Sequence, residues 1–279
     1  MKPKTTDSIL KSNKKNNLTA STADRHWLYE QSVQDVEEEV VFLDKTFSQR
    51  RGRMALSLRE DFCGTAAAAC RWVDSHPDRT ATGVDIDPEV LNWGRENNVS
   101  KLETEKQLKV ELLQQDVMTV ETPEVDLLVA FNFSYWIFKT RNELRRYFEQ
   151  AYKGVKSDGL FMLDAFGGSE AHDEMKEKTK LDGFKYIWDQ AEYDPVTGDL
   201  TCHIHFKFND GTRMKRAFSY HWRLWTLPEI RELLIEAGFK NVTVYWEGTD
   251  DDGEGTGEYL PVTRGEADPA WIAYLVAEK

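Results

Sequence analysis

The chain has 279 residues, which is long enough to bury a substantial core in one domain with an elaboration. Hydrophobic residues make up 40% of it and charged residues 30%, as in ordinary globular proteins. The net charge of −13 disfavours tight, non-specific binding to nucleic acid, which depends on many Lys and Arg contacts to phosphate.

Cysteine usage and the N-terminus indicate the compartment. Cys63, Cys70 and Cys202 are widely spaced and form no CxxC pair, which predicts free thiols in a reducing environment. Residues 1–24 are rich in Lys, Ser, Thr and Asn and predict a disordered basic tail that lacks the apolar core of a signal peptide. No stretch has the apolar length that a bilayer-spanning helix needs. We therefore expect a cytoplasmic protein with no membrane association.

Strands and helices alternate along residues 26–166. Apolar residues at helical spacing predict a helix at 26–47, and an alanine-rich helix follows a strand at 54–58. Asp87 as N-cap and Pro88 at the first helical position predict the start of another helix. This alternation is typical of a parallel sheet with helices on both faces. The other elements predicted in this region are strands at 80–86, 110–117, 125–135 and 159–166 and a helix at 142–155.

The pattern then changes. Residues 171–225 indicate three or four antiparallel strands joined by short turns. Residues 226–279 predict a helix that begins with a capping box between Thr226 and Glu229, followed by strands that complete the sheet. The expected organisation is a core at 25–170, an antiparallel β insert, and a C-terminal part of the core.

Carboxylates stand where the first three parallel strands are predicted to end, at Glu60, Asp85 and Asp116. Ligands of open parallel sheets bind beyond the carboxyl ends of the strands. Gly64 permits a tight turn with close backbone approach after the first strand, and Thr65 can cap the helix that follows. Asp85 follows this glycine by about 20 residues, the separation at which an acidic side chain chelates ribose hydroxyls. The sequence therefore predicts a nucleoside-binding site.

These motifs resemble the class I S-adenosylmethionine-dependent methyltransferases over residues 26–170. ALSLREDFCGTA resembles the first motif of that family, TGVDIDPEVL the second, QQDV the third and VDLLVAFNFSYWIF the fourth. The resemblance implies a Rossmann-like α/β fold, with a mostly parallel seven-stranded sheet and a small antiparallel β insert as a substrate lid. It also implies S-adenosyl-L-methionine as cofactor. The implied contacts are Glu60 with the methionyl amino group, the loop of Cys63, Gly64 and Thr65, Asp85 with the ribose, Ile86 and Val117 with the adenine faces, Asp116 with the adenine edge, and Asn132 near the methyl.

The glycine loop departs from the family pattern at two positions. Phe62 stands at its first glycine and Ala66 at its third. Alanine is tolerable at a helix start, whereas a phenylalanine restricts the backbone of the turn and its ring must be accommodated. Three acids at successive strand ends still favour cofactor binding over three solvated loop residues.

Candidate acceptor-binding residues carry weaker signals. Asn132 and Tyr135 lie in a segment similar to an Asn-Pro-Pro-Tyr signature, but both prolines are missing. His221 is a candidate general base because the pKa of imidazole suits proton removal near neutrality. His203 and Tyr29 are candidate substrate contacts, and each could equally be a structural side chain. The histidines match no zinc spacing and the acidic segment 249–259 does not fit an EF-hand, so we expect no metal site.

Three functions are consistent with these features. The first is methyl transfer to a small-molecule acceptor such as an amine or a hydroxyl compound. The second is methylation of protein or RNA, with docking through the basic tail and the arginines at 141, 145 and 146. The third is a non-catalytic nucleoside-binding regulatory module, suggested by Phe62 in the loop.

Overall fold

The computed structural model describes residues 18–250 and 255–279, which divide into two compact units. The parallel unit comprises Asp35–Ala171 and Leu224–Lys279. The antiparallel unit comprises His172–Arg223 together with the described residues before Asp35. Residues 25–34, which we expected in the core, therefore belong to the antiparallel unit.

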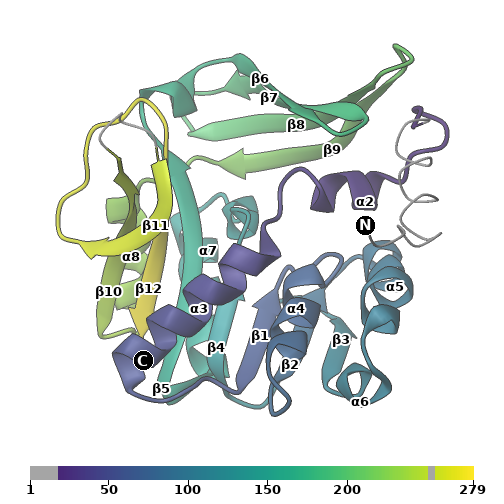
Figure 1. Cartoon of the computed structure of the whole chain (residues 1–279). Coiled ribbons are helices and arrows are strands. Elements are labelled where there is room, and N and C mark those ends of the chain that lie inside the picture. Colours follow the sequence, from purple (N-terminus) through teal and green to yellow (C-terminus); the bar gives the residue numbers. More distant parts are fainter. Residues whose placement is uncertain (1–17, 251–254) are drawn as a thin grey trace. The chain divides into compact units, whose positions relative to one another are not determined.

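One eight-stranded sheet forms the centre of the parallel unit, in the order β11-β10-β12-β5-β4-β1-β2-β3 (Figure 1). Strands β1 to β5 run parallel, and β10, β11 and β12 pair antiparallel at one side. The predicted Rossmann-like class is confirmed, with β11 as one strand more than expected. The bounds are β1 (Ser57–Asp61), β2 (Thr80–Asp85), β3 (Val110–Gln114), β4 (Val125–Ala130), β5 (Val155–Gly167), β10 (Asn241–Thr249), β11 (Gly255–Val262) and β12 (Trp271–Glu278).

The helices of this unit begin where the sequence supplies caps. Asp87 accepts the amide of Glu89 at 2.8 Å and stands before Pro88, so this helix begins as predicted. Thr226 and Glu229 form the predicted capping box. The helices are α3 (Val36–Arg51), α4 (Ala67–Ser75), α5 (Pro88–Asn97), α6 (Thr104–Gln107), α7 (Arg141–Gly154) and α8 (Leu227–Glu236), with 3-10 turns η1 (Val99–Lys101), η2 (Ser134–Ile137) and η3 (Ser169–His172).

Two predicted elements are shorter than expected. The helix predicted at 26–47 is two helices, α2 (Arg25–Glu30) and α3, because Asp35 caps a new helix by accepting the amide of Glu38. The strand predicted at 125–135 ends at Ala130, where the backbone leaves the sheet.

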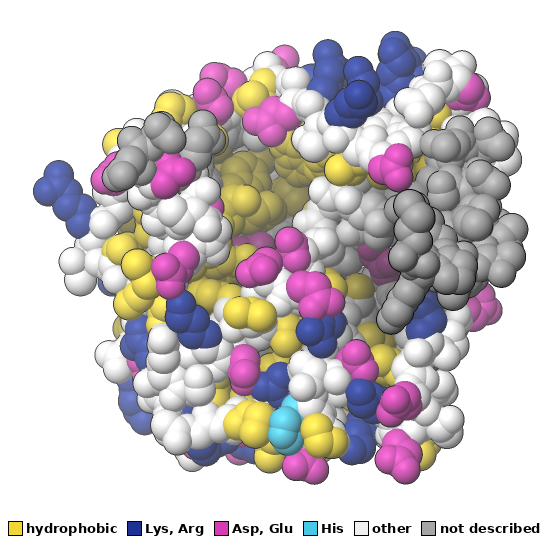
Figure 2. All heavy atoms as spheres, viewed as in Figure 1, with side chains coloured by type: hydrophobic (Ala, Val, Ile, Leu, Met, Phe, Trp, Pro, Cys, Tyr) yellow, Lys and Arg dark blue, Asp and Glu magenta, His cyan; other side chains and the backbone are white. Residues whose placement is uncertain are grey.

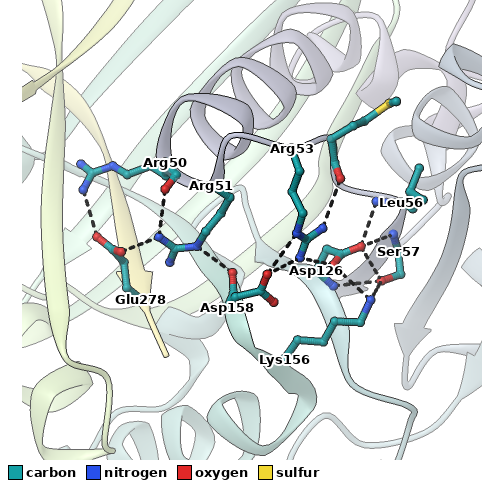
Figure 3. A network of polar contacts seen from close by, with 10 residues as sticks. Arg50, Arg51, Arg53, Leu56, Ser57, Asp126, Lys156, Asp158 and Glu278 are labelled. Carbon is teal, nitrogen blue, oxygen red and sulfur yellow. Dashed lines mark hydrogen bonds and ion pairs between the residues drawn. The ribbon is translucent and has the colours of Figure 1, made fainter.

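A network of ion pairs ties together the amino ends of the parallel strands (Figure 3). Asp126, at the start of β4, accepts the amides of Leu56 and Ser57 at 2.9 and 3.0 Å. Arg53 and Lys156 donate to its other oxygen at 2.9 and 3.0 Å. Burial alone would raise the pKa of Asp126, but these donors hold it well below its ordinary value. The network therefore stabilises the end of the sheet at which the parallel strands begin. The predicted site residues lie at the opposite end, where these strands finish.

A second ion pair is buried inside the parallel unit, on β1 itself. Arg59 Nε donates to Asp61 Oδ1 at 2.7 Å, and their side chains are 1% and 0% exposed. The hydroxyl of Tyr147, on α7, donates to Asp61 Oδ2 at 3.0 Å. Burial raises the pKa of Asp61, while Arg59 and Tyr147 oppose the shift. This pair, which the sequence analysis did not predict, fixes the end of β1 against α7.

The antiparallel unit is a four-stranded sheet in the order β6-β7-β8-β9, with α2 packed into its apolar cluster through Leu28. Leu18 and Ala20 pack against the same cluster, so residues 18–24 are part of this unit and not of a disordered tail. The remainder of the predicted tail, residues 1–17, lies outside the described residues. The strands are β6 (Met175–Leu181), β7 (Phe184–Tyr193), β8 (Asp199–Phe208) and β9 (Arg213–Arg223).

All three cysteines are buried and free, as predicted. Within residues 18–250 and 255–279, no helix combines the length and apolar character needed to cross a membrane.

Candidate active site

The loop between β1 and α4 keeps the backbone of a glycine-rich turn without its first and third glycines. The φ angles are +58° at Phe62, +52° at Gly64 and +56° at Ala66, in the left-handed region that side chains disfavour. The ring of Phe62 packs against Phe138 and Tyr147, with centroids 6.1 and 5.6 Å apart. Packing therefore accommodates the ring of Phe62, and the backbone is left-handed at both positions that depart from the motif.

The side chains of Cys63 and Thr65 are buried in this loop, at 1% and 4% exposure. A Cβ added to Gly83 on β2 would lie 2.8 Å from Cys63 Sγ, which places this thiol inside the sheet packing. The predicted helix cap by Thr65 is wrong: the N-cap is Ala66, and its left-handed backbone separates Thr65 from the first helical residue. Thr65 Oγ1 has no hydrogen-bond partner among the described residues. Both residues could meet a ligand through backbone atoms only.

Asp85 connects the end of β2 to this loop. Its Oδ2 accepts the amide of Gly64 at 2.8 Å and its Oδ1 accepts the amide of Asp87 at 2.9 Å. Burial raises the pKa of Asp85, and the two amides oppose the shift. Each carboxylate oxygen has a second lone pair for a ligand hydroxyl. Ile86, the next residue, is 69% exposed, so a carboxylate and an apolar side chain are presented together beside the loop.

The third strand end differs from the expectation in one respect. Asp116 follows β3, is exposed, and accepts the amide of Met118 at 2.8 Å, so its carboxylate remains accessible. Val117 is only 5% exposed and has little surface to pack against a base. Ile86 is therefore much the more exposed of these two apolar side chains, and the adenine contacts of both stay predictions.

Three carboxylates, Glu39, Glu60 and Asp164, form what we call the carboxylate cluster, with one member each from α3, β1 and β5. Glu60 is 8% exposed and accepts the amide of Ala69 at 3.0 Å. Burial, then the charge of Glu39, raises the pKa of Glu60 to about 8. Burial, then Asp164, raises the pKa of Glu39 to about 8. A cationic group bound here would offset the cost of ionising the cluster.

The loop after β4 lies beside the loop after β1, because Glu60 pairs with Val129 in the sheet. Asn132 is half-buried at this edge. Tyr135 is fully buried and its hydroxyl donates to the main-chain oxygen of Asp164 at 2.8 Å. Tyr135 therefore has no exposed surface and supports the loop from inside, and its substrate contact stays a prediction.

The remaining candidates lie in the antiparallel unit. His203 is 5% exposed, and its Nδ1 lies 2.8 Å from Ser219 Oγ. His221 is exposed, with Nδ1 3.4 Å from Thr201 Oγ1. The ring of Tyr29 lies 5.0 Å from that of Phe218. The catalytic role of His221 and the substrate roles of His203 and Tyr29 stay predictions. In the part of the chain that the structure describes, no group of three or more His, Cys, Asp or Glu side chains is placed to hold a metal ion.

Gly64→Ala tests whether a ligand approaches the loop closely. An alanine Cβ here would have its nearest neighbour, Val90 Cγ2, at 4.0 Å, so the methyl would project into open space. Gly52, with φ +66° and nothing within 4 Å of an added Cβ, is a matched control at the end of α3. Both substitutions should cost about 1 kcal/mol of stability through left-handed strain. Only Gly64→Ala should weaken cofactor binding, by about tenfold or more in calorimetry; equal affinities for the two variants would contradict close approach.

Known methyltransferases are similar to this chain in sequence and in fold. Residues 62–159 match a family model described as "Methyltransferase domain". The putative methyltransferase YqeM of Bacillus subtilis (strain 168) is 21% identical over 203 residues, covering 71% of this chain and 79% of that protein.

Two solved structures share the fold. An S-adenosylmethionine-dependent methyltransferase from Clostridium acetobutylicum ATCC 824 superposes with a TM-score of 0.67 at 15% identity, over 91% of this chain and 96% of that one. The sugar N-methyltransferase KedS8 from Streptoalloteichus sp ATCC 53650 does so with a TM-score of 0.62 at 15% identity, over 94% of each chain.

By its match to the family model, the segment 62–159 is a methyltransferase domain. The chain is similar to methyltransferases over these residues, and its fold is that of a solved S-adenosylmethionine-dependent methyltransferase, as the motifs predicted.

Proposed function

We propose that this enzyme transfers a methyl group from S-adenosyl-L-methionine to a small-molecule acceptor, with an amine as the favoured acceptor class. The observation that carries the proposal is the left-handed loop at 62–66, tied by Gly64 to the carboxylate of Asp85 and flanked by the exposed Ile86. This arrangement fits a nucleoside whose ribose lies against Asp85 and whose base lies against Ile86. Asp116 would accept from the edge of the base.

The residues at the methionyl end also fit the cofactor. Glu60 is a buried carboxylate with a neighbouring acid, and a methionyl ammonium group would supply the counter-charge. When bound, S-adenosylmethionine supplies a methyl group already activated on a sulfonium. The chain then has to align the acceptor with that methyl and exclude water, and Asn132, in the loop after β4, would contribute to this alignment.

An amine acceptor is favoured by the charge of the site. Glu39 and Asp164 extend the carboxylate cluster beyond Glu60, so the site can accommodate a second cationic group. KedS8, which shares the fold, is a sugar N-methyltransferase. A protonated amine would bind as a cation and would have to lose its proton before it is methylated. A carboxylate with a pKa raised towards neutrality is suited to accept that proton.

A macromolecular acceptor is less well supported. Arg141 is paired with Glu236, and Arg145 with Glu149, so two of the three arginines considered for docking are neutralised. Figure 2 shows Asp and Glu side chains interspersed with Lys and Arg over the parallel unit on the side in view. We also propose a cytoplasmic setting, on the ground that the three cysteines are free.

Titration with S-adenosylmethionine in a calorimeter tests the proposal, with Asp85→Asn and Asp87→Ala as a matched pair. Asp85→Asn should weaken binding by about 1–3 kcal/mol, because it removes charge-assisted bonds to the ribose. Asp87→Ala removes only the cap of α5 and should cost about 1 kcal/mol of stability with affinity unchanged.

Absence of binding to the wild-type protein at millimolar ligand would refute the cofactor. A non-catalytic module would bind the ligand yet form no S-adenosylhomocysteine with a panel of small primary and secondary amines and hydroxyl compounds. If Asp85→Asn binds as the wild type does, the ribose assignment is wrong.

A further inference from the structure

Asp164, near the carboxyl end of β5, holds the loop that follows β4. Its side chain is buried, at 7% exposure. Oδ2 accepts the amide of Asn132 at 2.8 Å and Oδ1 accepts the amide of Phe133 at 2.9 Å. The main-chain oxygen of the same residue accepts the hydroxyl of Tyr135 at 2.8 Å. One residue of β5 therefore fixes the neighbouring loop at three points.

The loop that Asp164 holds is strained. The φ angles of Asn132 and Phe133 are +58° and +57°, although neither residue is glycine. The ring of Phe133 packs edge-on against Phe166 of β5, with centroids 4.8 Å apart. Backbone strain of this kind persists only where the surroundings impose it, and it clusters at binding and catalytic sites.

The position of the loop connects it to the reaction. In the sheet, β4 lies between β1 and β5, and Glu60 of β1 pairs with Val129 of β4. The segment beginning at residue 131 therefore leaves the sheet beside the loop at 62–66. Two successive left-handed residues set the direction in which Asn132 projects, and a change in either would move its side chain.

We propose that Asp164 is a positioning residue for methyl transfer, whose ionised carboxylate binds the amides of Asn132 and Phe133 and so keeps the Asn132 side chain beside the reacting methyl group. This inference rests on the proposed function and adds to it a residue that acts through the loop.

The hold depends on ionisation, because a carboxylate accepts two amide hydrogen bonds more strongly than a neutral acid does. Burial raises the pKa of Asp164 to about 7, although the amides of Phe133 and Asn132 oppose the shift. The hydrogen bonds from the amides of Asn132 and Phe133 to Asp164 should therefore strengthen as the pH rises through about 7. Other titratable groups interact with the charge of Asp164. One is Glu39 from α3, with a pKa of about 8. The others are three tyrosines with raised pKa values, Tyr135 from η2, Tyr259 from β11 and Tyr274 from β12.

Asp164→Asn tests the inference, with Asp126→Asn as a matched control. Asp126 is likewise a buried carboxylate that accepts two successive amides, those of Leu56 and Ser57, but at the opposite edge of the sheet. The probe is S-adenosylhomocysteine, and the readouts are its affinity by calorimetry and the amide signals of the isotope-labelled full chain by NMR.

In the wild-type protein, we expect the amide signals of Asn132 and Phe133 to shift with a midpoint near pH 7, and the side-chain amide of Asn132 to shift when the probe binds. In Asp164→Asn the midpoint should be absent, the two amides should exchange with solvent at least about tenfold faster, and the Asn132 response should be lost. Asp164→Asn should still bind the probe, because Asp164 makes no assigned contact with the nucleoside. Asp126→Asn should leave the signals of Asn132 and Phe133 unchanged.

Three possible results distinguish failure of the inference about Asp164 from failure of the proposed function. If Asp164→Asn keeps the protected amides and the Asn132 response, Asp164 does not position the loop, while the proposed function stands. If the wild-type amides show no midpoint near pH 7, the expected pH dependence of the loop contacts is contradicted, and Asp164→Asn decides the positioning role. If the wild-type protein does not bind the probe at millimolar concentration, the proposed function itself fails.

Discussion

Replacing Asp61 with alanine is expected to lower the free energy of unfolding by about 3–5 kcal/mol, because it leaves a buried guanidinium without a counter-charge. Arg59 is 1% exposed, and its Nε and Nη2 both donate to Asp61, at 2.7 and 3.3 Å. The side chain cannot move easily into water, since a Cβ added to Gly154 at the end of α7 would lie 3.0 Å from Arg59 Nη1. Urea denaturation near neutral pH measures the loss.

The double variant Arg59→Met with Asp61→Leu is the control for this prediction. It removes both charges and fills the same space with apolar groups, a change that is often neutral or stabilising for buried pairs. The double variant should therefore recover part of the stability that Asp61→Ala loses, and the rest is the cost of leaving the Tyr147 hydroxyl without its acceptor. A loss below about 1 kcal/mol for the single variant would mean that water or another acid reaches Arg59, and the pair would not be a closed unit.

The Arg59–Asp61 pair shows that a strand with a polar sequence can be almost entirely buried. Ser57–Asp61 reads SLRED, a largely polar segment, yet all its residues from Leu58 on are buried. A central strand of a parallel sheet is covered on both faces, so its polar residues are not turned to solvent as they are in an amphipathic strand. Opposite charges two residues apart share a strand face, and this spacing of Arg59 and Asp61 was the one available signal.

Local capping was predictable because its partners are close in the chain. Asp87 caps α5 through Glu89, as expected from the Asp-Pro pair that begins that helix. The same chemistry at Asp35 and Glu38 was outweighed by the apolar periodicity of residues 26–47, so the break before α3 was missed. The left-handed cap at Ala66 has no local signal, because packing around the loop imposes it.

The candidate site divides in the same way. Glu60 and Asp85 were predicted to lie at the site because parallel strands present their ends at one edge, so position along the chain indicated position in space. Glu39 and Asp164 join the carboxylate cluster from α3 and β5, neither of which was predicted to contribute to the site. The local sequence around Glu39 or Asp164 gives no sign that a second carboxylate lies nearby, because only the fold brings these residues together.

Cofactor affinity is expected to rise with pH, by up to about tenfold for each pH unit below 8, because Glu60 must ionise to pair with the methionyl ammonium group. Burial and Glu39 raise the pKa of Glu60 to about 8 in the free protein, so near neutrality most of it is protonated. Calorimetric titrations between about pH 6.5 and 8.5 should show this rise. At the upper end of this pH range, Glu60→Gln should bind the cofactor more weakly than the wild type does. The titration of the ligand itself affects both proteins equally, so it cancels in the ratio of their affinities.

Stability should change in the opposite direction. The folded-state pKa of about 8 lies above the ordinary value of 4.5, so the contribution of Glu60 to stability is present below the ordinary value and is lost as the pH rises through about 8. Glu60→Gln keeps an oxygen for the amide of Ala69 and removes the buried charge. Near pH 8.5 the variant should therefore be at least about 1 kcal/mol more stable than the wild type while binding the cofactor less tightly. A wild-type to variant affinity ratio that stays constant over this pH range would show that Glu60 does not pair with the methionyl group, and a variant that loses both stability and affinity would assign it a purely structural role.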